Sequence, residues 1–229
     1  MYSRAVLTYE KETPVRLTKH AHACVELVKD GPSIVFDPGT LTPGAKDAIA
    51  RAGAVFITHE HFDHFDEALV AEALERQPEL QVFGPSAVLE KLGDHGGRVR
   101  AVAAGDVIEA AGFRLTVHGE RHASIHPDIP NVDNVGYLVD GSLFHPGDAY
   151  FAPDAPVSTL LLPTSGPWTK LGEAADFVRA VRPARVIQIH ELMLSDLGRR
   201  STATLLGEDG LTGVAVTEVP VGDSVELAG

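Results

Sequence analysis

The stretch AVFITHEHFDHFDEALVAEALE, residues 54–75, joins an apolar run to an amphipathic run through eight residues that include three histidines and three carboxylates. The apolar run AVFIT predicts a buried strand, and FDEALVAEALERQ predicts a helix because its apolar residues recur at helical spacing. We expect this helix to begin near Asp66, whose carboxylate suits the N-cap position. The polar residues therefore lie at a strand-to-helix turn, where the backbone leaves a sheet.

This turn has the pattern His-x-His-x-Asp-His, supplied by His59, His61, Asp63 and His64. His59 and His61 are two positions apart, so in an extended chain both side chains point the same way. Donors this close would repel one another when protonated and would be costly to bury unpaired. A divalent cation removes both problems. A solvated turn rich in histidine is the plain alternative, and the spacing favours the metal site.

The length and composition suit one domain with a sizeable core, because 44% of the 229 residues are hydrophobic. The formal net charge of −13 disfavours contact with a phosphate backbone, so we expect no long nucleic acid as a partner. We find no transmembrane run and no secretory signal, and therefore expect no membrane partner. Cys24 is the single cysteine, which excludes an internal disulfide and predicts a cytoplasmic location. Assembly into a homo-oligomer stays open.

Each half of the chain is predicted to contain a run of short strands joined by turns, followed by strand-helix-strand units. The expected strands are 15–21, 23–30, 33–39, 54–58, 81–85, 98–105, 106–112, 113–120, 135–141, 142–148, 159–166 and 185–191. The expected helices are 42–53 with Thr42 as N-cap, 65–77, 86–93 capped by Ser86, 170–183, and 195–206. A closing hairpin or edge strand is expected over 217–228. The pattern predicts an α/β fold, a four-layer αββα sandwich, as a single domain over 1–229 built of two similar halves.

Three further polar residues follow other predicted strands, namely His122, Asp148 and His190. Consecutive strands of such a sandwich end at a common edge, so these side chains are expected to meet the first group. Together they make five histidines and two aspartates. Since zinc takes three or four protein ligands, seven residues suit two ions that share one bridging ligand. With no thiolate cluster available, zinc fits best, and manganese, iron or nickel are compatible.

This arrangement resembles the metallo-β-lactamase superfamily over nearly the whole chain. The resemblance implies that His59, His61 and His122 bind a first metal, that Asp63, His64 and His190 bind a second, and that Asp148 bridges them. The chain is more closely similar to the compact bacterial branch that includes ascorbate-6-phosphate lactonase. That likeness rests on His22-Ala23-Cys24, on Phe36-Asp37-Pro38, and on LLLPTSGPWTKLGEAADF, residues 160–177.

The predicted function is a dinuclear metal-dependent hydrolase in which a metal-bound hydroxide attacks a small ester, lactone or phosphoester substrate. In this prediction Asp63 is the catalytic residue, because it orients the hydroxide and accepts its proton. Three alternatives stay open. They are a phosphodiesterase acting on a nucleotide or lipid, a mononuclear iron enzyme that oxidises a thiol, and a metal-binding protein without turnover.

Several residues are assigned supporting roles. Candidates for substrate binding are His126, Asn134, Tyr137, Trp168 and Thr169. His22 and Asp37 are candidates for orienting the ligands by hydrogen bonds, with an ordinary buried histidine and a turn cap as the alternatives. His118 competes with His122 as the third ligand of the first metal, and we favour His122 because His118 falls within a predicted strand.

Overall fold

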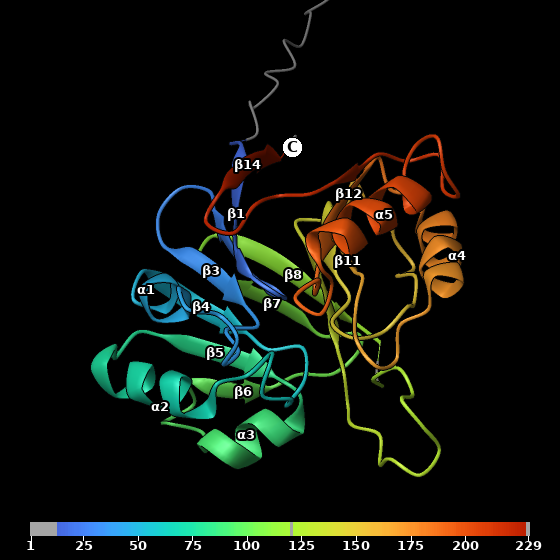
Figure 1. The fold of residues 1–229 in the computed structure, drawn as a ribbon. Helices are drawn as coiled ribbons and strands as arrows, with labels where there is room; N and C mark the ends of the chain where they lie inside the picture. Colours follow the sequence, from blue (N-terminus) through green and yellow to red (C-terminus); the bar gives the residue numbers. More distant parts are fainter. Residues whose placement is uncertain (1–12, 120, 228–229) are drawn as a thin grey trace, which may run out of the picture.

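The computed structural model describes residues 13–119 and 121–227. They form two β-sheets that pack face to face, with helices on the outer side of each sheet (Figure 1). Within these residues each sheet has seven strands. The four-layer αββα sandwich expected from the sequence is therefore confirmed. No helix in the described ranges is both long and apolar enough to cross a bilayer.

The first sheet has the strand order β14-β1-β2-β3-β4-β5-β6. Its members are β1 (Val15–Ala21), β2 (Cys24–Val28), β3 (Ser33–Phe36), β4 (Ala52–Phe56), β5 (Gln81–Gly84), β6 (Val99–Ala101) and β14 (Ser224–Leu227). Strands β1 to β3 pair antiparallel, whereas β3 to β6 pair parallel. As a result β1, β3 and β4 all run in the same direction and end at the same edge.

The second sheet repeats this plan, in the order β13-β12-β11-β10-β9-β8-β7. Its members are β7 (Val107–Ala110), β8 (Phe113–His118), β9 (Gly136–Val139), β10 (Leu143–His145), β11 (Thr159–Pro163), β12 (Arg185–Ile189) and β13 (Val216–Thr217). Strands β7 to β10 pair antiparallel, and β10 to β13 pair parallel. The carboxyl ends of β10, β11 and β12 therefore also share one edge.

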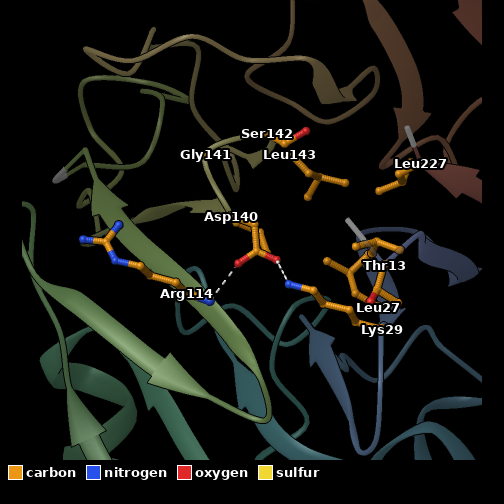
Figure 2. A pocket seen from close by; sticks show the side chains of 11 residues that line it. Thr13, Leu27, Lys29, Arg114, Asp140, Gly141, Ser142, Leu143 and Leu227 are labelled. Atoms are coloured by element: carbon orange, nitrogen blue, oxygen red, sulfur yellow. Dashed lines mark hydrogen bonds and ion pairs between the residues drawn. The ribbon is translucent and has the colours of Figure 1, made fainter. Parts of the chain in front are cut away.

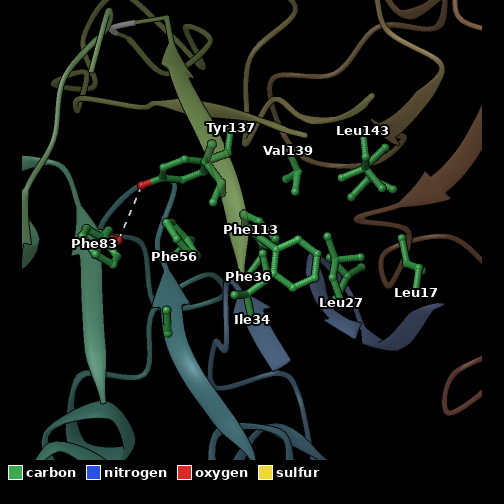
Figure 3. Packing of buried hydrophobic residues seen from close by; sticks show 14 of the residues in the cluster. Leu17, Leu27, Ile34, Phe36, Phe56, Phe83, Phe113, Tyr137, Val139 and Leu143 are labelled. Atoms are coloured by element: carbon green, nitrogen blue, oxygen red, sulfur yellow. Dashed lines mark hydrogen bonds between the residues drawn. The ribbon is translucent and has the colours of Figure 1, made fainter. Parts of the chain in front are cut away.

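The central core lies between the two sheets, and strand alternation explains it (Figure 3). Ile34 and Phe36 of β3 point into this core, while Val35 between them faces the outer helices. The ring of Phe56 lies 5.4 Å from that of Phe36 and 5.2 Å from that of Tyr137 in the opposite sheet, between centroids. Residues Ala54, Val55 and Phe56 of β4 are buried on both faces of the sheet and are all apolar, as the sequence of 54–58 indicated.

Five helices lie within the described residues. Their bounds are α1 (Ala45–Ile49), α2 (Glu67–Arg76), α3 (Ser86–Leu92), α4 (Leu171–Val181) and α5 (Asp196–Leu206). The first three contribute to one buried cluster with the first sheet, and α4 and α5 contribute to another with the second sheet. The helices close the outer layers and leave the carboxyl edge of the strands free for loops.

Two of the expected helix starts are wrong. The first helix begins at Ala45 with Gly44 as N-cap, because the carbonyl of Thr42 instead closes a turn by accepting from the N–H of Ala45 at 3.1 Å. Ser86 is already inside α3, whose N-cap position is held by Pro85 without a side-chain hydrogen bond. Proline has its φ pre-set, so the helix starts one residue earlier than a serine cap would allow.

The expected closing hairpin is also wrong. Strands β13 and β14 belong to different sheets: β13 pairs with β12, and β14 pairs with β1. The edge-strand alternative holds, because each of the two lies at the end of its sheet. The last part of the described chain therefore crosses from one sheet to the other.

The expected N-cap of α2 is confirmed, since the carboxylate of Asp66 accepts from the N–H of Leu69 at 3.0 Å. Asp66→Ala should lower the free energy of unfolding by about 0.5–2 kcal/mol, because it removes this bond from the helix start. Ser86→Ala is the matched control, because Ser86 caps nothing. Urea unfolding of the metal-free variants measures both values. Equal losses in the two variants would contradict the assignment.

Candidate metal centre

The predicted metal ligands gather where strands of both sheets end. Residues 58–64 follow β4, and Asp148 and His190 follow β10 and β12. His122 lies in the long connection after β8, where its backbone N–H donates to the carbonyl of Val132 at 3.0 Å. The carboxyl edges of the two sheets thus bring together side chains from both halves of the chain.

These side chains form two clusters, and a third group, made of His59, His64 and Asp148, links them. The first cluster is His59, His61 and His122, which each offer one ligand nitrogen within 4.8 Å of the others. The second cluster meets the same limit and consists of His22, Asp63, His64 and His190. The first cluster is the set that the resemblance implied for one metal. The second contains the set implied for the other metal, with His22 added.

Asp148 lies between the two clusters and contacts both. Its Oδ1 is 3.2 Å from Nε2 of His64, and its Oδ2 is 3.2 Å from Nε2 of His190. The same Oδ2 lies 3.4 Å from Nε2 of His122 in the first cluster. One carboxylate therefore reaches both groups of imidazoles, which is the geometry that a bridging ligand needs.

The unpaired polar atoms of these buried side chains fit a metal site. Among the described residues, buried donor atoms without a hydrogen-bond partner include Nε2 of His59, Nε2 of His64, both ring nitrogens of His190, Nδ1 of His22 and Oδ1 of Asp148. An unpaired buried polar atom costs about 1–3 kcal/mol. Imidazole nitrogen and carboxylate oxygen are zinc ligands, so a divalent cation would satisfy several of these atoms at once.

Asp37 fixes the orientation of His64 in the second cluster. Its Oδ2 lies 2.7 Å from Nδ1 of His64 and accepts from the hydroxyl of Thr58, also at 2.7 Å. Its Oδ1 accepts from the backbone N–H of Thr58 at 2.7 Å. The bond to Nδ1 leaves Nε2 of His64 facing Asp148 and the cluster. The role expected for Asp37, which is to orient a metal ligand by hydrogen bonds, stays a prediction.

The turn that carries Asp37 fits tightly under the histidine loop. A Cβ at Gly39 would collide with the backbone carbonyl of Asp63. The N–H of Thr40 donates to the carbonyl of Phe62 at 2.8 Å, and the N–H of Asp66 donates to the carbonyl of Pro38 at 3.1 Å. The Pro-Gly turn after β3 is therefore a support for the loop as well as a chain reversal.

His22 contacts both Asp63 and His190 of the second cluster. Its Nε2 lies 3.1 Å from Oδ2 of Asp63, so it can orient that carboxylate. Its ring centroid is also 3.7 Å from that of His190, and its backbone carbonyl accepts from the N–H of His190 at 2.9 Å. The β1–β2 turn thereby joins the site to the edge of the first sheet.

His122, and not His118, reaches the first cluster. Nδ1 of His122 donates to the carbonyl of Ala123 at 2.6 Å, so its Nε2 faces the other ligands as a lone pair. His118 is the last residue of β8 and pairs through Nε2 with the hydroxyl of Thr116 at 2.9 Å. Its position in the strand directs it away from the cluster, as the strand pattern indicated.

The residues predicted to bind substrate have other partners in the structure. Asn134 donates to the carbonyl of Pro146 and accepts from the N–H of Asp148, both at 2.9 Å. The hydroxyl of Thr169 donates to the carbonyl of Gly166 at 2.9 Å. Both residues therefore hold loops that carry or flank Asp148.

The other three differ in burial. His126 is exposed and accepts from the backbone N–H of Asp128 at 3.1 Å. Tyr137 is fully buried, and its hydroxyl donates to the carbonyl of Ile57 at 2.9 Å. Trp168 is buried with its indole against Asp148. The structure does not bring His126 into either cluster.

Sequence reasoning missed two supporting residues. Thr58 bonds Asp37 and contacts Nδ1 of His59 at 3.0 Å, and its place between a buried strand and the first ligand was the available signal. His145 accepts from the N–H of Gly147 at 3.1 Å and lies 3.1 Å from the carbonyl of Ala23. It supports the turn before Asp148. His145 lies within an apolar strand, where spacing gives no signal.

Burial and nearby carboxylates shift the pKa values of the imidazoles in opposite directions. Burial among neighbouring histidines holds the pKa of His59 well below its ordinary value, so this ring stays neutral. Burial opposes the charge of His190 as well, but the carboxylates of Asp148 and Asp63 outweigh it and raise the pKa of His190 to about 9. Asp148 and Asp37 likewise outweigh burial and raise the pKa of His64. The metal-free site therefore holds protons on the second cluster.

A separate cavity of about 490 Å³ lies at the other end of the sandwich (Figure 2). It is lined by the first residues of β1 and β10, Val15 and Leu143, whereas the clusters follow the last residues of these strands. An ion pair of Lys29 with Asp140, 3.1 Å between Nζ and Oδ2, closes part of its rim. None of its lining residues belongs to the two clusters.

Comparison with known proteins identifies the family of this chain. A family model described as Beta-lactamase superfamily domain matches residues 16–190. The chain belongs to this family. Protein Rv0786c of Mycobacterium tuberculosis is similar, with 37% identity over 79% of this chain and 86% of the relative. The UPF0173 metal-dependent hydrolase Ta0764 of Thermoplasma acidophilum is 26% identical over 77% of this chain and 83% of its own.

Solved structures share the fold of this chain. Igni18, a metallo hydrolase from the archaeon Ignicoccus hospitalis, aligns with a TM-score of 0.73 at 21% identity and covers 94% of this chain and 99% of its own. The expected fold and family are therefore confirmed, and the expected class of metal-dependent hydrolase agrees with the names of these relatives. The narrower likeness to ascorbate-6-phosphate lactonase stays a prediction.

The two histidines in the β8 region provide a direct test of the first cluster. His122→Ala should lower the metal content of the purified protein, because it removes one of three nitrogens that face one point. His118→Ala should leave it nearly unchanged, because the ring of His118 bonds the hydroxyl of Thr116 in β8 and belongs to neither cluster. Elemental analysis of both variants beside the parent measures the difference. Metal lost from the His118 variant and kept by the His122 variant would reverse the assignment.

Proposed function

We propose that this protein is a dinuclear metal-dependent hydrolase that acts on a small ester, lactone or phosphoester. The observation that carries the proposal is the pair of clusters joined by Asp148, with buried ligand atoms that no described residue satisfies. His59, His61 and His122 would hold one ion. Asp63, His64 and His190 would hold the other, and Asp148 would contact both. Zinc is the proposed metal, since the donors are imidazoles and carboxylates.

The chemistry that the ions supply is a water ligand of lowered pKa and polarisation of the substrate oxygen that gains charge. The protein contributes the rest. It buries His59, His64 and Asp148 nearly completely, so the donors are fixed before the substrate arrives. The hydrogen bond to Asp37 leaves Nε2 of His64 free to face the site, and the hydrogen bond to the Ala123 carbonyl does the same for His122.

Asp63 is the proposed proton acceptor. Its contacts with histidines within 4 Å all involve Oδ2, from His22 at 3.1 Å, His190 at 3.5 Å and His64 at 4.0 Å. Burial opposes its ionisation, but the neighbouring imidazoles of His190 and His22 hold its pKa below the ordinary value. The side chain is 14% exposed, unlike the fully buried His64 beside it. An ionised carboxylate thus faces the solvent side of the second cluster.

Asp63→Asn should lower the turnover of p-nitrophenyl acetate or bis-p-nitrophenyl phosphate, whichever the parent cleaves, by about 10²–10³-fold. The amide keeps the shape but supplies neither the charge nor the proton acceptance. Asp66→Asn is the matched control, because it makes the same change three residues away, where asparagine caps a helix equally well. Turnover of the Asp63 variant within about threefold of the parent, at equal metal content, would remove this role.

Metal uptake should release protons near pH 7. His190, with a pKa raised to about 9 in the metal-free protein, is protonated there, and a metal takes its lone pair only after the proton leaves. The affinity for Zn²⁺ should therefore rise with pH up to about 9 and fall as the pH drops. Calorimetry in buffers of different ionisation enthalpy counts the protons. Uptake of two ions without proton release would contradict this account of His190.

The number of ions separates the proposal from its rivals. Two ions per chain and loss of activity on chelation support the hydrolase, whereas a single iron supports thiol oxidation. Two ions without turnover of ester, lactone, phosphodiester or thioester panels would favour a binding protein. Chelation should also lower the melting temperature, because ions that bind only the folded state stabilise it.

A further inference from the structure

The loop between β11 and α4 carries the single tryptophan of the chain. The indole of Trp168 is 5% exposed, and its Nε1 donates to Oδ2 of Asp148 at 2.9 Å. Its ring lies edge-on to those of His122 and His190, at 5.9 Å and 6.4 Å between centroids. One side chain therefore contacts the carboxylate between the clusters and packs near a histidine of each.

The loop is shaped to deliver this contact. A Cβ at Gly166 would lie 3.0 Å from Nε1 of Trp168 and 3.5 Å from Cε1 of His190, and the φ of Gly166 is +136°. Only glycine accepts both the conformation and the close approach. The N–H and the hydroxyl of Thr169 both bond the carbonyl of Gly166, at 3.2 Å and 2.9 Å, and close the turn.

We propose that Trp168 is a positioning residue, which sets the orientation of Asp148 and thereby the affinity of the site for its second ion. The inference rests on the proposed dinuclear function. The other side-chain nitrogens that pair with the Asp148 carboxylate, among the described residues, are ring nitrogens of His64, His122 and His190. These nitrogens cannot donate to Asp148 while they bind metal.

The indole N–H differs from them because it neither ligates a metal nor titrates. It keeps donating to Oδ2 whether or not ions are bound, and so holds the carboxylate plane while the histidines change partners. Oδ1 has no hydrogen-bond partner among the described residues and is left for an ion. Partners that hold a ligating carboxylate typically account for about 10–100-fold in metal affinity.

The test removes the donor while keeping the ring. Because Trp168 is the single tryptophan, growth on β-(3-benzothienyl)alanine exchanges its N–H for sulfur at this position alone, and Trp168→Phe is the genetic counterpart. Zn²⁺ affinity is measured by competition with a chromophoric chelator, beside the melting temperature of the metal-free protein. We expect the second ion to bind about 10–100-fold more weakly in both proteins.

Tyr150→Phe is the matched control. It removes the bond from the Tyr150 hydroxyl to the carbonyl of Pro163, 2.8 Å long, within the same aromatic cluster and without touching Asp148. A merely structural role for Trp168 would lower the melting temperatures of Trp168→Phe and Tyr150→Phe and leave Zn²⁺ affinity unchanged. In the parent, Co²⁺ should quench the tryptophan emission, because the indole contacts the bridging carboxylate.

The outcomes keep the two proposals apart. If the parent binds two ions and the benzothienyl protein binds both within about twofold of the parent affinity, the positioning role is wrong and the hydrolase proposal stands. If the parent takes up no metal, the proposed function fails and this inference falls with it. A selective loss at the second ion, absent from Tyr150→Phe, supports the inference.

Discussion

The buried carboxylate of Asp37 is the contact on which the arrangement of the site depends. It is inaccessible to solvent, lies at the end of β3, and bonds the backbone and hydroxyl of Thr58 together with the ring of His64. Three bonds from one side chain fix both ends of the histidine loop relative to the first sheet. A carboxylate so buried is tolerable only because its oxygens are satisfied. The loop is therefore held by polar contacts, while the apolar core beneath it only places the strands.

The second sheet is hydrogen-bonded to the first beside the residues that Asp37 holds. Tyr137 of β9 reaches across the core and bonds the carbonyl of Ile57, the residue before Thr58. Asn134 and His145 hold the turn that leads to Asp148. These bonds fix the distance between the end of β4, in the first sheet, and the end of β10, in the second sheet. The proposed pair of metal ions depends on that distance, because Asp148 could not reach both clusters if the strand ends lay a few ångströms further apart.

Sequence reasoning predicted the fold, and it predicted which segments bring their histidines and aspartates together, because both leave local signals. The apolar run at 54–58 and the His-x-His-x-Asp-His pattern are contiguous in the sequence. The meeting of His122, Asp148 and His190 with them was expected because strands of a layered sandwich end at a common edge. The helix start at Ala45 was missed because the turn closed by Thr42 uses a backbone carbonyl, which any residue offers. The pairing of β14 with β1 was missed because it joins segments far apart in the chain. The indole bond of Trp168 was missed for the same reason, since it depends on how two loops meet.

The crossing of the chain between the sheets has a consequence for biosynthesis. The outer edge of β1 is covered by β14, with the hydroxyls of Thr18 and Ser224 in contact at 2.8 Å across 206 residues of sequence. At about 5–20 residues per second, a ribosome needs roughly 10–40 s to make the second partner after the first. Throughout that interval a nascent chain presents an unpaired strand edge, which is a template for pairing with other chains. The exposed charged residue Arg16 within β1 is the kind of side chain that limits such pairing until the edge is closed.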